Sequence, residues 1–306
     1  MYQRKITVQE YDTIIIGAGI AGMTAAIYLK RENMNVLIIE KEMPGGQMVK
    51  TPIIENYPGF LKIEGSELAL NIYKQVNELG IKIKFEEVKN IDENNKYKVI
   101  KTNKNSYKAK NVIISTGRSP KKLGLLNEEE LIGKGISYCA TCDGAFYKDK
   151  KIAVVGGGNT SITESLFLSN IVSELKLIHR REQFRSEEKL LQNLKEKSNV
   201  NIRINLEIKE INKIKDKLHL TLSTEEMLVV DGLFIFIGYE PQLDFISNLD
   251  LKMNNGYISV DKKMKTNISG IYACGDIIDK DLYQLVTATG EASIAADSIK
   301  KELLLR

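Results

Sequence analysis

The chain has 306 residues, about the length of two ordinary domains. Hydrophobic residues make up 43% and charged residues 27%, which indicates a globular protein and excludes a disordered one. The net charge of +4 is small for this length, the lysines are scattered and Trp is absent, so a nucleic-acid-binding surface is not expected.

The N-terminal region shows no targeting or membrane segment. Residues 1–11 mix charged and apolar side chains and lack the hydrophobic core of a signal peptide. The longest apolar run, residues 14–29, contains three glycines and is shorter than the roughly 20 residues that a membrane span requires. Three cysteines are too few for a secreted disulfide framework. The sequence therefore predicts a cytoplasmic protein with no membrane partner.

The first element pattern is a strand, a glycine turn and a helix. Residues 12–16 form a short β-branched run that predicts a buried parallel strand. Gly17, Gly19 and Gly22 follow, and a second predicted strand ends at Glu40. The first glycine makes the tight turn, the second admits a pyrophosphate and the third allows close packing of helix and strand. The helix N-terminus faces the diphosphate, and Glu40 is placed to accept a hydrogen bond from a ribose 2′-hydroxyl. This unit predicts a dinucleotide without a 2′-phosphate.

A close cysteine pair, Cys139 and Cys142, comes next in the chain. Such a pair is a redox disulfide, half of a zinc site or two inert thiols. Zinc is not expected, because the third cysteine, Cys274, and the only two histidines lie far away in the sequence. We interpret Cys274 as a small buried residue. Asp143 follows the pair directly and is a candidate proton donor or acceptor, although an Asp before Gly is equally a common turn former.

The strand–glycine–helix pattern then occurs a second time. Residues 152–155 predict a strand that leads into Gly156-Gly157-Gly158-Asn159-Thr160-Ser161, a helix and a second strand ending at His179. Gly17 corresponds to Gly156 and Glu40 to His179 at the same offset. Ser161 replaces a glycine or alanine at the close-packing position but is still small. The repeat predicts a second dinucleotide site.

The end of the second repeat differs from the first in charge. His179, Arg180, Arg181 and Arg185 lie where the first repeat has Glu40. Arginine binds phosphate in bidentate fashion, so the cluster favours a 2′-phosphate and hence NADPH. The alternative is a solvated charged face, because three glutamates lie close by. We therefore expect FAD at the first site and NADPH at the second.

In combination these motifs resemble those of the low-molecular-weight, bacterial-type thioredoxin reductases, a group of pyridine nucleotide-disulfide oxidoreductases, over essentially the whole chain. The matching elements are Gly17-Ala18-Gly19-Ile20-Ala21-Gly22, Gly45-Gly46-Gln47, Asn56-Tyr57-Pro58-Gly59, Thr116-Gly117, Cys139 to Gly144, His179 to Arg185, Cys274-Gly275-Asp276, and Tyr283-Gln284 with Ala288 and Gly290. The order of the motifs is specific to the group, although no single motif is.

The resemblance implies an α/β protein with two Rossmann-like dinucleotide-binding domains, the second inserted into the first. Residues 1–117 and 246–306 would form the FAD-binding domain, and 118–245 the NADPH-binding domain with the redox pair. Hinges are expected near 115–120 and 243–248. A homodimer and a cytoplasmic thioredoxin-like partner are also implied.

The resemblance further implies roles for individual residues. Cys142 would be the thiol nearest the flavin, Cys139 would attack the partner's disulfide and Asp143 would be the acid–base residue. The FAD site would be formed by Gly17, Gly19, Gly22, Glu40, Gly46, Gln47, Asn56, Thr116, Gly117, Gly275, Asp276 and Gln284. The NADPH site would be formed by Gly156, Gly158, Asn159, Thr160, His179, Arg180, Arg181 and Arg185. No metal is implied. Electrons would pass from NADPH through FAD and the disulfide to the partner.

The sequence departs from the family pattern around the NADPH site and the flavin edge. Asn159, Ser161, Thr163 and Ser165 replace an acid, an alanine, another acid and an alanine, and Tyr283 stands where an arginine is usual. Three alternatives therefore remain: a ferredoxin-dependent relative, a reductase for a peroxiredoxin or glutaredoxin-like partner, and a non-catalytic nucleotide-binding redox sensor. The retained arginine cluster argues against ferredoxin as the donor.

Overall fold

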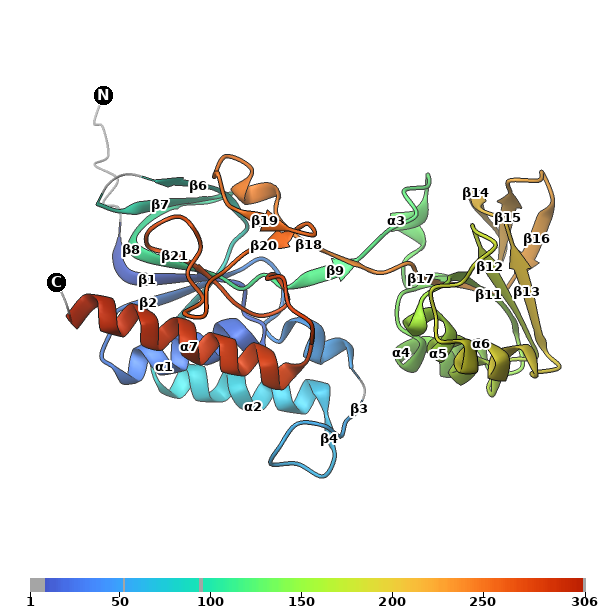
Figure 1. The fold of residues 1–306 in the computed structure, drawn as a ribbon, viewed down its shortest axis with the longest axis horizontal. Helices are drawn as coiled ribbons and strands as arrows, with labels where there is room; N and C mark the ends of the chain where they lie inside the picture. Colours follow the sequence, from blue (N-terminus) through green and yellow to red (C-terminus); the bar gives the residue numbers. More distant parts are fainter. Residues whose placement is uncertain (1–8, 52, 94–95, 305–306) are drawn as a thin grey trace. The chain divides into compact units, whose positions relative to one another are not determined.

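The computed structural model describes residues 9–51, 53–93 and 96–304. The chain divides into two compact units, one of Met1–Ser119 with Pro241–Arg306 and the other of Pro120–Glu240. The second unit is inserted in the chain of the first, and the two connecting segments, β9 (Arg118–Pro120) and β18 (Tyr239–Pro241), pair with each other (Figure 1). The chain divides after Ser119 and after Glu240, whereas the sequence placed the boundaries after 117 and after 245.

The first unit is built on a seven-stranded sheet. Its order is β5 (Lys82–Phe85), β2 (Val36–Glu40), β1 (Glu10–Ile16), β8 (Ser106–Ile114), β7 (Lys98–Thr102) and β6 (Val88–Glu93), with β21 (Ile271–Ala273) beside β8. The pairs of β5, β2, β1, β8 and β21 are parallel, and β6, β7 and β8 are antiparallel. After the inserted unit, the chain returns to the first unit and adds β21 to the same sheet.

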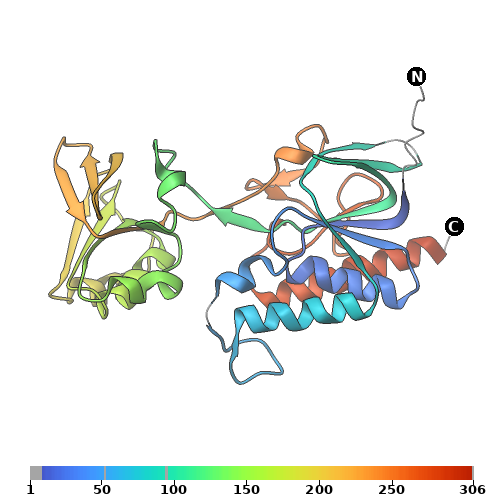
Figure 2. The same ribbon diagram turned by 180° about the vertical axis from the view of Figure 1, so that it is seen from behind.

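Alternate residues of these strands face two cores. Ile15 and Ile38 face α1 (Ile20–Arg31), α2 (Gly65–Glu78) and α7 (Leu285–Leu304), which lie on one side of the sheet in Figures 1 and 2. Ile14 and Leu37 face the other side, as the two-residue period of a strand dictates. Because both faces are covered there, residues 14–16 of β1 and 36–39 of β2 form apolar runs, and each fully buried aliphatic side chain stabilises the fold by about 1.5–3 kcal/mol.

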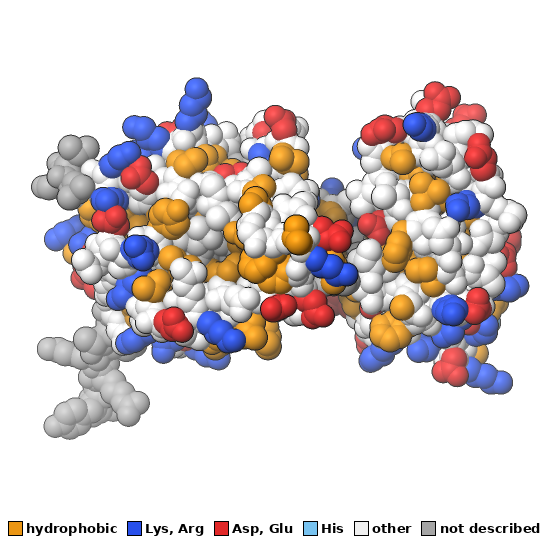
Figure 3. Space-filling model, turned by 90° about the horizontal axis from the view of Figure 1, so that it is seen from below, with side chains coloured by type: hydrophobic (Ala, Val, Ile, Leu, Met, Phe, Trp, Pro, Cys, Tyr) orange, Lys and Arg blue, Asp and Glu red, His pale blue; other side chains and the backbone are white. Residues whose placement is uncertain are grey.

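The smaller elements of the first unit lie in its connections. They are η1 (Gly46–Lys50), β3 (Ile53–Ile54), β4 (Ile63–Glu64), η3 (Asp244–Ile246), β19 (Met253–Asn254) and β20 (Tyr257–Ile258). Hydrophobic side chains gather on one face of this unit in Figure 3. Exposed large apolar residues of the β3–β4 region and of the start of α7 include Ile53, Phe60, Leu61, Leu282 and Val286.

The second unit is built on a five-stranded parallel sheet. Its order is β10 (Ile136–Ser137), β17 (Gly232–Phe236), β11 (Lys151–Gly156), β12 (Glu174–His179) and β13 (Val200–Ile204). The helices α4 (Ala140–Asp143), α5 (Asn159–Ser169) and α6 (Glu188–Lys195) cover one face (Figure 1). The other face is covered by an antiparallel sheet of β14 (Ile208–Ile214), β15 (Lys217–Leu222) and β16 (Met227–Val230). The remaining elements are α3 (Glu128–Leu131) and η2 (Gly144–Tyr147).

The predicted fold class is confirmed, since each unit holds a strand–glycine turn–helix–strand motif in a parallel sheet. None of the helices in the described ranges combines the length and apolar character needed to span a bilayer.

Candidate active site

The first glycine turn connects β1 to α1. Gly17 has φ +102°, and a methyl group on it would lie 2.6 Å from the Ser115 carbonyl oxygen. A methyl group on Gly22 would lie 1.9 Å from the Gly17 carbonyl oxygen. A methyl group on Gly19 would meet no atom within 4 Å. Gly17 and Gly22 are therefore required by the backbone, whereas Gly19 borders open space at the N-terminus of α1.

Other expected residues of the first unit converge on this turn. Glu40, at the end of β2, accepts a hydrogen bond from the Ala18 amide at 2.7 Å. A methyl group on Gly46 would lie 3.2 Å from Gly19 Cα, and one on Gly275 would lie 2.9 Å from Ala21 Cβ. Segments from both ends of the chain thus surround the start of α1, because β21 joins the sheet beside β8.

A second group of contacts ties the surrounding loops together. Gln47 Nε2 donates to the Arg118 carbonyl oxygen at 2.7 Å, and Asn56 Nδ2 donates to Gln284 Oε1 at 2.9 Å. Thr116 Oγ1 is buried and has no hydrogen-bond partner among the residues that the structure describes. A buried donor without a partner beside an open glycine turn fits a polar ligand, and the turn fits the diphosphate of a dinucleotide.

This geometry predicts different effects for two alanine substitutions. Gly19→Ala is expected to leave the melting temperature nearly unchanged but to weaken FAD binding at least about 10-fold, because the methyl group enters the open space beside the turn. Gly22→Ala is expected to lower the melting temperature by several degrees, because its methyl group overlaps backbone. Thermal unfolding and FAD titration of the apoprotein measure the two effects. Equal melting temperatures and equal FAD affinities of the two variants would contradict the assignment of Gly19 to ligand binding and of Gly22 to helix packing.

A charged cluster that sequence reasoning missed lies next to Asp276. The Arg118 guanidinium lies over the Tyr283 ring, 4.0 Å from its centroid, and Arg118 Nε is 3.5 Å from Asp276 Oδ2. Lys280 is 3.3 Å from Asp276 and 3.0 Å from Glu291. Burial raises the pKa of Glu291. Arg118, from a distant segment of the chain, thus places a cation beside Tyr283.

The second glycine turn connects β11 to α5. Gly156 has φ +155°, and a methyl group on it would lie 2.5 Å from Ser161 Oγ. A methyl group on Gly158 would meet no atom within 4 Å, as at Gly19. The hydroxyl groups of Ser161 and Ser165 are buried and have no hydrogen-bond partner in the described part of the chain. Ser161 is small enough for the close approach of α5, and the open side of the turn fits a second diphosphate.

The loop after β12 presents the basic cluster. The His179 ring is buried; its Nε2 lies 3.1 Å from the Gln183 carbonyl oxygen, and it stacks on Phe184 with centroids 4.5 Å apart. The Arg185 amide donates to the Gly157 carbonyl oxygen at 2.8 Å, which folds the loop back on the glycine turn.

The three arginines of this loop, Arg180, Arg181 and Arg185, are exposed. Asn159 and Thr160 are exposed at the start of α5. The Asn159 side chain accepts from the Glu187 amide at 2.7 Å. His179 thus holds the loop, and the arginines are available to a ligand.

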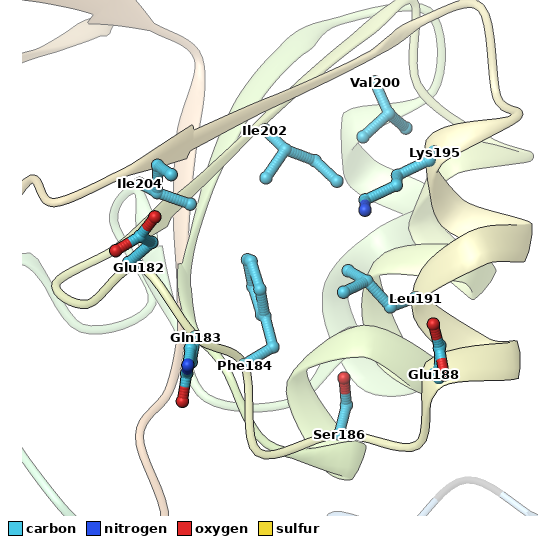
Figure 4. Close-up of a pocket in the computed structure, with 10 residues that line it drawn as sticks. All are labelled: Glu182, Gln183, Phe184, Ser186, Glu188, Leu191, Lys195, Val200, Ile202 and Ile204. Atoms are coloured by element: carbon cyan, nitrogen blue, oxygen red, sulfur yellow. The ribbon is translucent and has the colours of Figure 1, made fainter.

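A cavity of about 890 Å³ lies beside this loop, against α6 and the edge strand β13 (Figure 4). Phe184, Leu191 and Ile202 line it, and Glu182 and Glu188 stand at its rim. Lys195 also lines it, whereas Arg180, Arg181 and Arg185 do not. The cavity is therefore separate from the residues expected to bind the 2′-phosphate.

The cysteine pair forms a disulfide at the start of α4. Cys139 and Cys142 are bonded with Cα atoms 5.3 Å apart, and the Cys142 amide donates to Cys139 Sγ at 3.2 Å. Both residues are partly exposed, and Phe146, in η2, is 73% exposed. Cys274 is fully buried in the first unit, and burial raises the pKa of its thiol. The redox interpretation of the pair is the one that this geometry supports.

Asp143 is held by a residue that the sequence did not reveal. Ser137 Oγ, at the end of β10, lies 2.6 Å from Asp143 Oδ2 and also accepts a hydrogen bond from the Cys139 amide at 3.0 Å. A serine six positions before an aspartate carries no recognisable motif, so only the folded loop shows the contact.

A family model described as pyridine nucleotide-disulphide oxidoreductase matches residues 11–292. This chain belongs to that family. A thioredoxin reductase of Bacillus subtilis is 42% identical over 296 residues, which are 95% of this chain and 94% of the relative. A thioredoxin reductase of Mycoplasma genitalium is 42% identical over 303 residues, 96% of this chain and 95% of the relative. The crystal structure of Lactococcus lactis thioredoxin reductase is 36% identical with a TM-score of 0.81 and covers 97% of this chain and 100% of that one.

Proposed function

We propose that this protein is a thioredoxin-disulfide reductase that passes electrons from NADPH through FAD and the Cys139–Cys142 disulfide to a thioredoxin-like protein. The observation that carries the proposal is the partly exposed disulfide on a unit that also holds a dinucleotide-type glycine turn. Membership of the disulphide oxidoreductase family and likeness to thioredoxin reductases over nearly the whole chain support it.

The residues divide between two nucleotide sites. The FAD-binding residues proposed in the first unit are Gly17, Gly19, Gly22, Glu40, Gly46, Gln47, Asn56, Thr116, Gly117, Gly275, Asp276 and Gln284. The NADPH-binding residues proposed in the second unit are Gly156, Gly158, Asn159, Thr160, His179, Arg180, Arg181 and Arg185. When bound, the two cofactors supply the hydride and electron transfer that side chains cannot. The chain's own groups bind the diphosphates at the helix N-termini and the 2′-phosphate at the arginines.

The cysteines have unequal roles in this proposal. The Cys142 amide hydrogen bond to Cys139 Sγ favours a thiolate at Cys139 after the disulfide opens. Cys139 then attacks the partner's disulfide, and Cys142 resolves the mixed disulfide. Asp143 exchanges the proton. The exposed Phe146 ring beside the pair offers apolar contact area, which suits a protein partner better than a small disulfide.

We also propose that the enzyme is a cytoplasmic homodimer. Ile53, Phe60 and Leu61 are exposed apolar residues of the first unit, and Leu61 is 99% exposed. The Asn56–Gln284 hydrogen bond joins their loop to the start of α7, so they can form one interface with its exposed apolar residues. A solution mass of one 34.5 kDa chain would contradict the dimer. A cysteine pair that must open and close suits a reducing compartment, and recovery in the secreted fraction would contradict that location.

One anaerobic titration tests the proposed function. The purified protein is expected to be yellow, to lose its flavin absorbance only with about two equivalents of NADPH per chain, one for the disulfide and one for the flavin, and to require far more NADH for the same loss. It is then expected to reduce thioredoxin in steady turnover. Bleaching by reduced ferredoxin but not by NADPH would contradict NADPH as the electron donor. Colourless protein without flavin would overturn the function and favour a redox sensor.

A further inference from the structure

We infer that Ser137 is a positioning residue that keeps the Asp143 carboxyl group in place while it exchanges its proton. This inference rests on the proposed function, because it concerns the acid–base step of the same dithiol. Ser137 is 3% exposed at the end of β10 and cannot contact a partner protein. Its hydroxyl group therefore acts only through its neighbours in the loop.

The Ser137 hydroxyl group has three contacts and one proton. It accepts from the Cys139 amide at 3.0 Å, and its proton has two acceptors, Asp143 Oδ2 at 2.6 Å and the Cys139 carbonyl oxygen at 3.1 Å. A distance of 2.6 Å is typical of a hydroxyl group that donates to a carboxylate. While Asp143 is charged, the Ser137 proton therefore points to Asp143.

Protonation of Asp143 reverses this arrangement without moving the side chains. A hydroxyl oxygen accepts two hydrogen bonds. A protonated Asp143 can donate to Ser137 Oγ, which turns its own proton to the Cys139 carbonyl oxygen 3.1 Å away. The Asp143 carboxyl group thus keeps a hydrogen bond in both protonation states. This matters because proton transfer requires donor and acceptor within about 2.6–3.2 Å.

In the mixed disulfide, the Cys142 sulfur attacks Cys139 Sγ, so the Cys139–Cys142 bond forms and the bond from Cys139 to the partner breaks. The two bonding electrons leave with the partner's sulfur. Asp143 takes the proton from the Cys142 thiol and passes it to the leaving partner thiolate. Ser137 itself gains and loses nothing.

Other titratable groups around Asp143 have to be separated from this effect. α4 packs against α5 and η2. In η2, burial and the charge of Asp143 raise the pKa of Tyr147, so this phenol stays neutral at neutral pH. In α5, burial raises the pKa of Glu164. The β17 strand beside β10 carries no titratable side chain. The Ser137 variants keep Tyr147 and Glu164, so neither group accounts for a difference between the pH profiles.

The test compares two variants of Ser137 with a matched control. Ser137→Ala is expected to lower kcat with thioredoxin about 10-fold and to leave KM unchanged. Its pH profile is expected to move to higher pH, because a hydrogen bond to the charged carboxylate favours that form. Ser137→Thr keeps the hydroxyl group and is expected to restore both. Tyr138→Phe, the control, removes another hydrogen bond of the same loop, from Tyr138 to Glu128 at 2.6 Å, and is expected to keep the wild-type profile.

A double-mutant comparison tests whether Ser137 acts through Asp143 or only stabilises the loop. In an Asp143→Asn background, Ser137→Ala is expected to cause no further loss of kcat, because the inference assigns the effect of Ser137 to Asp143 and not to its two contacts with the Cys139 backbone. If Ser137→Ala does not fold, Ser137→Gly replaces it with the same expected profile. A wild-type pH profile in the variant without a hydroxyl group, or an equal shift in Tyr138→Phe, overturns the inference. Absence of wild-type thioredoxin turnover overturns the proposed function instead.

Discussion

The Cys142→Ser enzyme is expected to lose at least about 1000-fold in thioredoxin turnover, because the thiol that resolves the mixed disulfide is gone. It is expected to remain yellow and to be bleached by NADPH, because the proposed flavin-binding residues all lie in the other unit. The measurements are steady-state thioredoxin reduction and anaerobic flavin absorbance. The matched control is Cys274→Ala, which removes the buried third thiol and is expected to keep turnover within about 2-fold.

The roles of Cys139 and Cys142 can be distinguished with a thioredoxin that keeps one cysteine, whose sulfur carries a thiol leaving group. The Cys142→Ser variant keeps Cys139, whose sulfur accepts the Cys142 backbone amide, and is expected to form the covalent complex at least about 10 times faster than Cys139→Ser. The reverse order would exchange the two roles. Unchanged turnover of Cys142→Ser would remove the disulfide from the proposed mechanism altogether.

The Arg180→Gln, Arg181→Gln double variant is expected to raise KM for NADPH about 100-fold, because each charged hydrogen bond to phosphate contributes about 1.5–3 kcal/mol. KM for NADH is expected to change less than about 2-fold, since NADH has no 2′-phosphate. Both side chains are exposed, so the fold should not change. Parallel steady-state kinetics with the two nucleotides measure the difference.

Lys189→Gln is a control for the loss of a positive charge elsewhere in the unit, because this exposed lysine of α6 lies outside the loop that carries the arginines. It is expected to leave the preference for NADPH intact. A similar rise of KM for NADPH and NADH in the arginine variant would instead identify the cluster as a general nucleotide contact or a solvated face. Preservation of both KM values would place the 2′-phosphate elsewhere.

Several features of this protein could be predicted because they depend on short-range backbone geometry. The glycine turns at Gly17 and Gly156 follow from positive φ angles and from close approach of a helix, which only small residues permit. The apolar runs of β1 and β11 follow from burial on both faces of a parallel sheet. The disulfide follows from two cysteines separated by one helical turn.

The side-chain contacts between distant segments could not be predicted. Arg118 reaches Tyr283 and Asp276 because β8 lies between β1 and β21 in the sheet, and no spacing in the sequence encodes that order. The stacking of His179 on Phe184 could not be predicted either, because it arises where the loop folds back on the Gly157 carbonyl group. Sequence spacing gives no information about such a reversal.

By itself the sequence determined which chemistry the chain carries: two dinucleotide-type turns, a redox cysteine pair and a basic cluster on the second unit. These are local patterns, and the backbone of a few residues fixes them. Only the tertiary structure decided how their side chains are held. Ser137 contacts Asp143, and Thr116 Oγ1 has no partner among the described residues, because of the way strands and loops pack. Hydrogen bonds depend on tenths of an ångström that no residue pattern specifies.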